Sequence, residues 1–170
     1  GKYSIKRLCG LLFARNMARF PELSRKAPRV VVYDGKSKIK TKLDITGKRG
    51  YGVGFSSLVE FVMNQLPQNE VIEHAIRKTI KMVPEIAIRE LVANAMIHQD
   101  FQITGASIMV ELFSDRVEIS NPGKPGVAID RFIDGFHSRN ERLASIMRRI
   151  GICEERSSGI DRVINAAEIY

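Results

Sequence analysis

Apolar residues recur at two different periods along the chain, and these periods predict its elements. Spacing of three to four residues, which is typical of helices, marks 5–15, 56–66 and 84–97. A short valine-rich run at 30–33 and an alternating run at 38–45 are typical of strands. Further along, the same patterns predict an alternating stretch at 75–82, a hairpin of strands 107–113 and 116–120, and helices at 129–134, 141–150 and 158–168.

The order of these elements predicts an α+β fold in which helices cover one face of a mixed sheet. Between the first two strands and the next helix lies a glycine-rich run, 47–54. It lacks the spacing of either common glycine-rich phosphate loop, so we interpret it as a flexible break. This predicts a small basic unit at 1–50 and a second unit at 54–170.

Charge is distributed unevenly around the net value of +8. Residues 1–50 contain 14 lysines and arginines against 3 acidic residues, whereas 51–170 contain 13 against 16. Such asymmetry indicates a segment that contacts a polyanion, with nucleic acid as the first candidate. A merely solubilising surface is an equally compatible interpretation.

Other protein classes are disfavoured by the composition. Apolar runs fall short of the roughly 20 residues that a membrane span needs, and no signal peptide is recognisable, so we expect a cytoplasmic protein without a membrane partner. Cys9 and Cys153 are far apart and predict free, buried thiols. His74, His98 and His137 lack metal-ligand spacing, so no structural zinc is expected.

The helix at 86–97 carries polar residues on an otherwise apolar surface, which predicts that it is buried. Glu90 and Asn94 lie one turn apart on one face, and His98 continues the stripe. A buried carboxylate and amide need partners. Those partners are either a neighbouring strand or arginine, or a hydrated Mg²⁺ with a nucleotide.

Two downstream segments favour the nucleotide. The turn Asn121-Pro122-Gly123-Lys124-Pro125-Gly126 follows a predicted strand and would let a base approach the backbone closely. Residues 154–160 lead into the last predicted helix, whose first-turn amides would favour phosphate.

Four ordered motifs together resemble a known family. They are RELVANAMIHQD at 89–100, DRVEISNPG at 115–123, SRN at 138–140 and EERSSGI at 154–160. They are similar to the GHKL-type ATP-binding domain of bacterial transcriptional regulators often described as RecG-related ATP-dependent DNA helicases. Those proteins place a Schlafen-like AlbA-type domain before this domain and a winged helix after it. The resemblance implies a GHKL (Bergerat-type) sandwich of helices on a mixed, mainly antiparallel sheet. It also implies that 1–50 is a basic α/β remnant of the preceding domain and that the winged helix is absent from this chain.

The resemblance also implies roles for individual residues. Glu90 and Asn94 match the N-box shared with gyrase, MutL and histidine kinases: Asn94 would coordinate Mg²⁺, and the catalytic Glu90 would orient or deprotonate the attacking water. Asn121 would accept a hydrogen bond from the adenine amino group in place of the usual aspartate, and Gly123 would let the adenine pocket close. The expected cofactor-binding residues are Asn94, His98, Asn121, Gly123, Arg139, Ser157, Ser158 and Gly159.

Some positions depart from the family pattern. The phosphate loop is reduced to Ser157-Ser158-Gly159, and Gln99 stands where relatives commonly have arginine. Ser158 and Asp161 also form an ordinary capping box, whose carboxylate would oppose phosphate. We therefore expect weak ATP binding and weaker hydrolysis.

The sequence thus predicts a Mg-ATP-binding module of a DNA-associated transcriptional regulator, with ATP as the conformational switch and slow ATPase activity left open. Helicase activity is not supported, because no Walker P-loop is present. The alternatives are a vestigial nucleotide site in a nucleic-acid-binding or dimerising module that acts through the basic N-terminal segment, and a structural linker domain. The expected partners are ATP, DNA and a second copy in a homodimer.

Overall fold

The computed structural model describes residues 7–73, 76–81, 83–124 and 138–153. The helices predicted at 129–134 and 158–168 and the motif at 154–160 lie outside the described residues.

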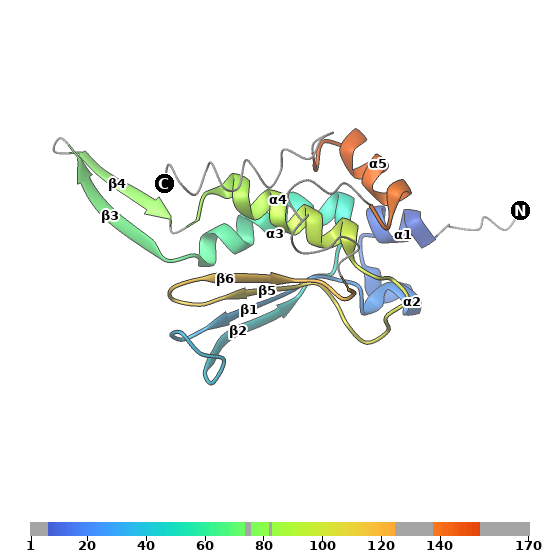
Figure 1. Ribbon diagram of the computed structural model, residues 1–170, viewed down its shortest axis with the longest axis horizontal. Coiled ribbons are helices and arrows are strands. Elements are labelled where there is room, and N and C mark those ends of the chain that lie inside the picture. Colours follow the sequence, from blue (N-terminus) through green and yellow to red (C-terminus); the bar gives the residue numbers. More distant parts are fainter. Residues whose placement is uncertain (1–6, 74–75, 82, 125–137, 154–170) are drawn as a thin grey trace, which may run out of the picture.

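A four-stranded sheet forms the base of the fold, in the order β2-β1-β5-β6 (Figure 1). β1 pairs with β5 in parallel, whereas the β1–β2 and β5–β6 pairs are antiparallel, so the sheet is mixed. The strands are β1 (Arg29–Tyr33), β2 (Thr41–Thr46), β5 (Met109–Leu112) and β6 (Val117–Ser120).

Helices cover one face of this sheet, with α3 and α4 lying across it in Figure 1. A separate two-stranded hairpin, β3 (Gln68–Glu73) and β4 (Ile76–Lys81), projects from one end. The helices are α1 (Arg7–Phe13), η1 (Met17–Arg19), α2 (Pro21–Ser24), α3 (Tyr51–Gln65), α4 (Glu85–His98) and α5 (Glu141–Arg149). In the part of the chain described here, no helix has both the length and the apolar character needed to cross a membrane.

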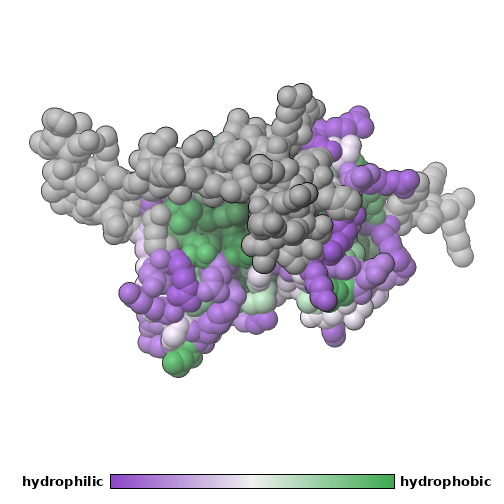
Figure 2. All heavy atoms as spheres, in the orientation of Figure 1, coloured by the Kyte–Doolittle hydropathy of each residue, from purple (hydrophilic) through white to green (hydrophobic). Residues whose placement is uncertain are grey.

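The core lies between the sheet and the helices. Val30 and Val32 of β1 point into it, because alternate residues of a strand share a face. Hydrophilic side chains cover most of the lower edge of the molecule, where β1 and β2 lie, and apolar surface is visible above that edge (Figure 2). The same core contains Leu11, Leu12, Met17, Tyr51, Phe55, Val59, Val62, Ile88, Val92, Met96, Val110, Leu112, Leu143 and Met147.

The α+β class with helices on a mixed sheet is confirmed, and the arrangement is consistent with a GHKL-like sandwich. The periodicities at 5–15, 30–33, 84–97 and 141–150 correspond to α1, β1, α4 and α5, and the predicted hairpin is β5–β6. The strand predicted at 38–45 begins only at Thr41, because the chain turns over residues 34–40.

The glycine run is not a flexible break. Gly50 is the N-cap residue of α3, which begins at Tyr51 rather than at the serines 56 and 57. The Gly50 amide donates to the Ala14 carbonyl at 2.8 Å, and a Cβ on Gly50 would lie 2.7 Å from the carbonyl carbon and oxygen of Leu12. The glycine therefore allows close packing of α3 against the N-terminal segment.

Residues on both sides of the glycine run share one sheet and one core. β1 lies between β2 and β5, and the side chains of α1 are buried against α3. In the described residues, 7–50 thus share one sheet and one core with the rest of the fold. The predicted domain boundary between 50 and 54 stays a prediction. The assignment of 1–50 to the end of a Schlafen-like domain stays a prediction as well.

Candidate functional site

α4 places Glu90 and Asn94 side by side on one face. Both are half-buried, and the Asn94 amide Nδ2 donates to Glu90 Oε1 at 3.4 Å. This orientation leaves the Asn94 Oδ1 as the acceptor available to a ligand. The helix thus presents one carboxylate and one amide oxygen at neighbouring positions.

The burial expected for α4 applies to only part of its circumference. Ala87, Ile88 and Val92 are buried in the core, but Ile86 and Leu91 are 42% and 37% exposed. The prediction of a helix buried all round is therefore wrong, because the sheet and α3 cover one side. Glu90 and Asn94 lie at the border between the buried and open sides.

Cys153 lies close enough to Glu90 to sense its charge. Burial raises the pKa of the Cys153 thiol to about 11, and the negative charge of Glu90 adds to this effect. Both cysteines are free, but Cys9 is exposed and Cys153 only half-buried, so the expectation of two buried thiols is corrected. The chain that follows α5 thereby passes near the face of α4 that carries Glu90 and Asn94.

The C-terminal end of α4 meets the turn that follows β6. The Asp100 amide donates to the Pro122 carbonyl at 2.7 Å. Arg139 Nη1 lies 3.3 Å from the Asp100 carboxylate, and its Nη2 donates to the Lys124 carbonyl at 2.8 Å. Three segments far apart in the sequence are joined at this point.

Gly123 fits this junction because it has no side chain. Its φ of +127° is a conformation that other residues rarely adopt, and a Cβ would lie 2.5 Å from Arg139 Nη1 and 3.0 Å from Asp100 Cβ. The space at this glycine is thus filled by Asp100 and Arg139. Its visible role is to bring the turn against the end of α4.

Asn140 closes the same junction from the start of α5. Its Nδ2 donates to the carbonyls of Ile97 at 2.7 Å and Gln99 at 2.8 Å, which satisfies acceptors that the end of a helix leaves open. Asn140 is part of the predicted motif at 138–140, but its hydrogen bonds to the end of α4 were not predicted. The serine-arginine-asparagine string contains no local signal for a contact with a helix 40 residues earlier.

Gln99 is a core residue. It is fully buried, and its Nε2 donates to the Tyr51 hydroxyl at 2.7 Å and to the Met96 carbonyl at 3.0 Å. The Tyr51 hydroxyl in turn donates to the Lys26 carbonyl at 2.7 Å, and burial raises the pKa of Tyr51 well above its usual value. The Gln99 side chain therefore links α4 to α3 and, through Tyr51, to the N-terminal segment.

The other residues predicted to bind the nucleotide do not all lie in one cluster. Asn121 is half-buried just after β6, with its Nδ2 3.5 Å from the Pro122 carbonyl, and His98 is exposed in the last turn of α4. Glu90 and Asn94 form one cluster, while Gly123 and Arg139 meet beside Asp100. The expected phosphate residues Ser157, Ser158 and Gly159 lie outside the described residues.

Part of the sequence and the fold of this chain are similar to those of known proteins. Residues 105–170 match the family described as "Putative ATP-dependent DNA helicase recG C-terminal". No curated protein matches the chain. The crystal structure of the DIP2311 protein from Corynebacterium diphtheriae is similar, with a TM-score of 0.75 and 22% identity over 97% of this chain. The chain spans 36% of the length of that protein. The fold is thus shared with a larger bacterial protein, and the C-terminal part of the chain is similar to an ATPase-like family.

Proposed function

We propose that the chain binds Mg-ATP on the α4 face that carries Glu90 and Asn94, and that occupancy switches the conformation of a DNA-associated transcriptional regulator. The similarity of residues 105–170 to an ATP-dependent family supports the nucleotide. The contacts that bring the motifs at 115–123 and 138–140 to the end of α4 support this location for the site.

The donor atoms on this face suit Mg²⁺. The ion prefers oxygen ligands, takes one or two of them from the protein and keeps water and phosphate oxygens for the rest. Asn94 Oδ1 is such a ligand, because the Asn94 amide nitrogen is directed toward Glu90. When bound, the ion would offset the negative charge of the triphosphate and polarise the terminal phosphate.

Glu90 has the position of a general base. Its carboxylate is half-buried beside Asn94, so it would accept a proton from a water molecule held next to the terminal phosphate. We propose slow turnover rather than rapid catalysis, since the departures at Ser157, Ser158 and Gly159 weaken the expected phosphate seat.

The adenine end of the site would lie near the turn after β6. Asn121 Oδ1 would accept a hydrogen bond from the adenine amino group, which distinguishes adenine from guanine. Gly123 and Arg139 hold this turn against Asp100. His98, one helical turn after Asn94, would extend the binding face of α4 toward the nucleotide.

The attachment of the turn at 121–124 to the end of α4 supports the proposal most directly. The Asp100–Pro122 hydrogen bond and the Asp100–Arg139 ion pair hold residues 121–124 beside the helix that presents Glu90 and Asn94. A base and a triphosphate can then contact two motifs that are about 30 residues apart in the sequence.

A titration with a fluorescent ATP analogue, with and without Mg²⁺, tests this proposal. We expect saturable binding that weakens at least about tenfold when Mg²⁺ is withheld or when Asn94 is replaced in Asn94→Ala, a loss of about 1.4 kcal/mol. Asn64→Ala, an exposed asparagine on α3, is the matched control and should bind like the unmodified chain. An affinity for the analogue that changes neither on removal of Mg²⁺ nor in Asn94→Ala would refute the role of Asn94 as a metal ligand.

The proposed conformational change needs a separate test, because ATP can bind without changing the conformation of the chain. Hydrogen exchange should slow around 121–124 and at the start of α5 when Mg-ATP is added, since the nucleotide would bridge these segments to α4. Unchanged exchange at saturating nucleotide would leave an ATP-binding module without a switch and reject that part of the proposal.

A further inference from the structure

A second concave region lies between the N-terminal segment and the start of α5. It is a cavity of about 990 Å³ lined by residues of α1, α2, the loop after α4 and residues 138–143. Glu90, Asn94 and Asn121 are not among its lining residues. The cavity, called here the arginine cleft, is therefore distinct from the proposed Mg-ATP site, although Arg139 lies at its edge.

Cations outnumber carboxylates on the walls of the arginine cleft. Its cationic residues are Arg7, Arg25, Lys26, Arg139 and Arg142, and its acidic residues are Glu22 and Glu141. Arg7 pairs with Glu22 at 2.5 Å and Arg139 with Asp100 at 3.3 Å. Within the described ranges, the side chains of Arg25 and Arg142 have neither a hydrogen bond nor an ion pair, so two guanidinium groups of the lining are available to a ligand.

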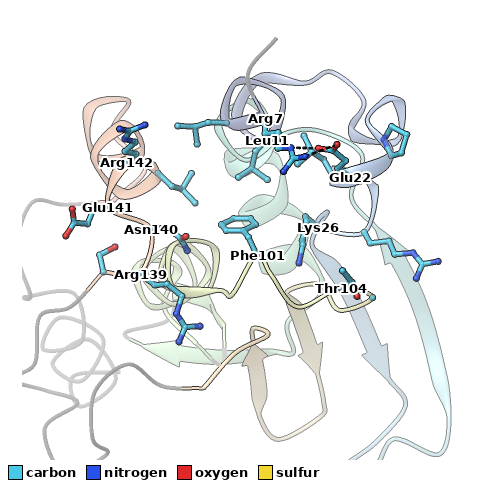
Figure 3. Close-up of a pocket in the computed structure, with 17 residues that line it drawn as sticks. Arg7, Leu11, Glu22, Lys26, Phe101, Thr104, Arg139, Asn140, Glu141 and Arg142 are labelled. Carbon is cyan, nitrogen blue, oxygen red and sulfur yellow. Dashed lines mark hydrogen bonds and ion pairs between the residues drawn. The ribbon is translucent and has the colours of Figure 1, made fainter. Parts of the chain in front are cut away.

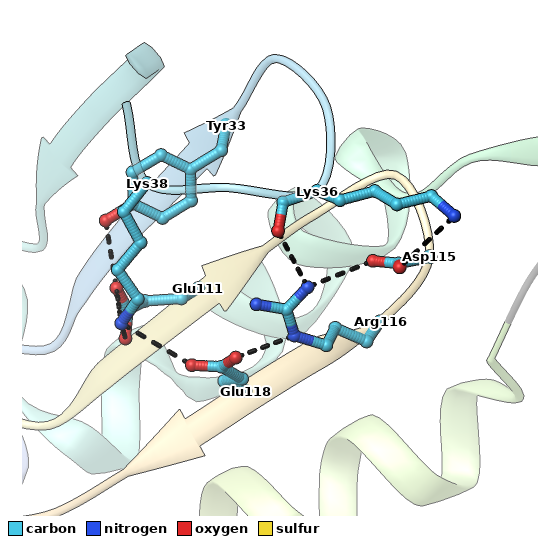
Figure 4. A network of polar contacts seen from close by, with 7 residues as sticks. All are labelled: Tyr33, Lys36, Lys38, Glu111, Asp115, Arg116 and Glu118. Atoms are coloured by element: carbon cyan, nitrogen blue, oxygen red, sulfur yellow. Dashed lines mark hydrogen bonds and ion pairs between the residues drawn. The ribbon is translucent and has the colours of Figure 1, made fainter. Parts of the chain in front are cut away.

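The lysines of the loop at 34–40 in the N-terminal segment are paired with carboxylates. Figure 4 shows Lys38 between Glu111 and Glu118, at 2.8 and 3.4 Å, while Arg116 pairs with Glu118. Lys40 pairs with Asp34 at 2.5 Å. The loop at 34–40 therefore offers less free positive charge than its sequence suggests, and the excess charge of residues 1–50 is available mainly elsewhere.

An aromatic ring lies inside the arginine cleft. In Figure 3 the half-buried Phe101 lies between Asn140 on one side and Lys26 on the other, with Leu11 above the ring. The Lys26 ammonium is 5.8 Å from the ring centre, and its only hydrogen bond within the described residues goes to the Ile103 carbonyl at 2.5 Å. The hydroxyl of Ser138, also in the lining, is buried without a partner among the described residues.

We propose that the arginine cleft binds a short stretch of single-stranded nucleic acid, with a base stacked on Phe101 and phosphates held by Arg25 and Arg142. A positively charged groove with an aromatic ring inside is the combination that binds single strands, because every base offers a flat face and every linkage a negative charge. A duplex keeps its bases stacked in pairs and could not place one on a recessed ring. The Ser138 hydroxyl and the remaining hydrogens of the Lys26 ammonium supply further hydrogen bonds to phosphate or base.

Fluorescence anisotropy with a labelled short oligothymidine, measured over a range of salt concentrations, tests this proposal. Arg25→Ala and Arg142→Ala should each weaken binding and lower the slope of log affinity against log salt by about 0.7. Phe101→Leu should weaken binding at least about fivefold with little change in that slope, since stacking is not ionic. Lys42→Ala, which removes an exposed lysine of β2 outside the cleft, is the matched control and should bind normally.

Competition identifies the ligand and separates the two sites. Excess Mg-ATP should not displace the oligonucleotide, and Asn94→Ala should bind the strand normally, even if the proposed Mg-ATP site fails its own test. Equal affinity for a duplex of the same length would overturn the proposal. So would displacement by AMP at concentrations similar to that of the strand, which would make the cleft a mononucleotide site. Melting temperatures of all variants confirm that they fold.

Discussion

The backbone amide of Asp100 donates a hydrogen bond to the carbonyl oxygen of Pro122 at 2.7 Å. This single bond joins the end of α4 to the turn after β6. Arg139 reinforces it by pairing with the Asp100 carboxylate. The proposed nucleotide site therefore depends on a junction that joins the end of α4, the turn after β6 and the segment before α5.

Gly123→Ala tests that junction. The new Cβ would require a strained φ of +127° and would lie 2.5 Å from Arg139 Nη1, so we expect a loss of about 1–3 kcal/mol in the free energy of unfolding. Gly151→Ala is the control, because Gly151 also has a positive φ, +73°, but open space around it. Urea unfolding should show the larger loss for Gly123, together with weaker ATP binding. Equal losses at the two glycines would show that the contact with Arg139 is unimportant.

Glu90→Gln separates catalysis from structural pairing. If Glu90 positions water, the variant should fold and bind ATP at least as well as the unmodified chain while losing its turnover. If Glu90 is instead the anionic half of a buried ion pair, the variant should lose about 3–5 kcal/mol of stability. Phosphate release and thermal unfolding, measured side by side with Glu60→Gln on the exposed face of α3, decide between the two roles.

The same variant makes a prediction about Cys153. The negative charge of Glu90 contributes to the raised pKa of this thiol, after the larger effect of burial, so Glu90→Gln should lower the Cys153 pKa from about 11. Alkylation followed against pH, in a background where Cys9 is replaced by serine, measures the shift. A thiol pKa that does not move would place Glu90 farther from Cys153 than the structure does.

Lys38→Ala should lower the melting temperature more than Lys42→Ala. Lys38 pairs with Glu111, which is 6% exposed, and among the described residues its removal leaves that carboxylate with only the Tyr33 hydroxyl at 2.9 Å. Lys42 has no ion pair among the described residues, so its loss should change little. Equal melting temperatures would indicate that Lys38 is in contact with solvent rather than with Glu111.

Acid should destabilise the fold partly through Glu118. The hydrogen bond from Arg116 holds the pKa of this carboxyl below its usual 4.5, so its contribution is present above that pH and is lost as pH falls through the lower folded value. Melting temperatures of the unmodified chain should therefore decline below about pH 4.5, and Glu118→Gln should show a shallower decline. Parallel curves for the two proteins would contradict this assignment.

Gly50→Ala tests whether the N-terminal segment is part of the fold. A Cβ at this position would lie 2.7 Å from the Leu12 backbone, which cannot move aside, so we expect a loss of about 1–3 kcal/mol. Ser56→Ala, on the exposed side of the same helix, is the control. A tolerated Gly50→Ala would mean that residues 7–50 separate easily from α3.

Periodicity predicted most of the elements, because it reflects which side of each element is buried. The valines of β1 and the apolar positions of α1 and α5 followed this rule, and the β5–β6 hairpin was visible from its turn. Glycine-rich sequence was misleading at 47–54. Glycine there serves close packing and an N-cap, and no local pattern distinguishes that use from a flexible break.

The contacts that organise the candidate site were the least predictable. The Asn140 bonds to the end of α4, the Gln99–Tyr51 contact and the fit of Gly123 against Arg139 all join segments that are far apart in sequence. The adjacency of Glu90 and Asn94 was predictable, because helical geometry alone produces it. The net charge of residues 1–50 also failed to predict which lysines are free to bind a polyanion, because some of them form ion pairs with distant carboxylates, as Lys38 does with Glu111.

The parallel pairing of β1 with β5 has a consequence for synthesis on the ribosome. Arg29 pairs with Met109, so the partner strand of β1 emerges some 80 residues after β1 itself. β2 can cover one edge of β1 at once as a local hairpin, but the other edge stays open for the several seconds that translation of those residues takes. During that interval the valines of the nascent strand are exposed to other chains, which makes this edge the place where a chaperone would act and where crowded expression would produce aggregates.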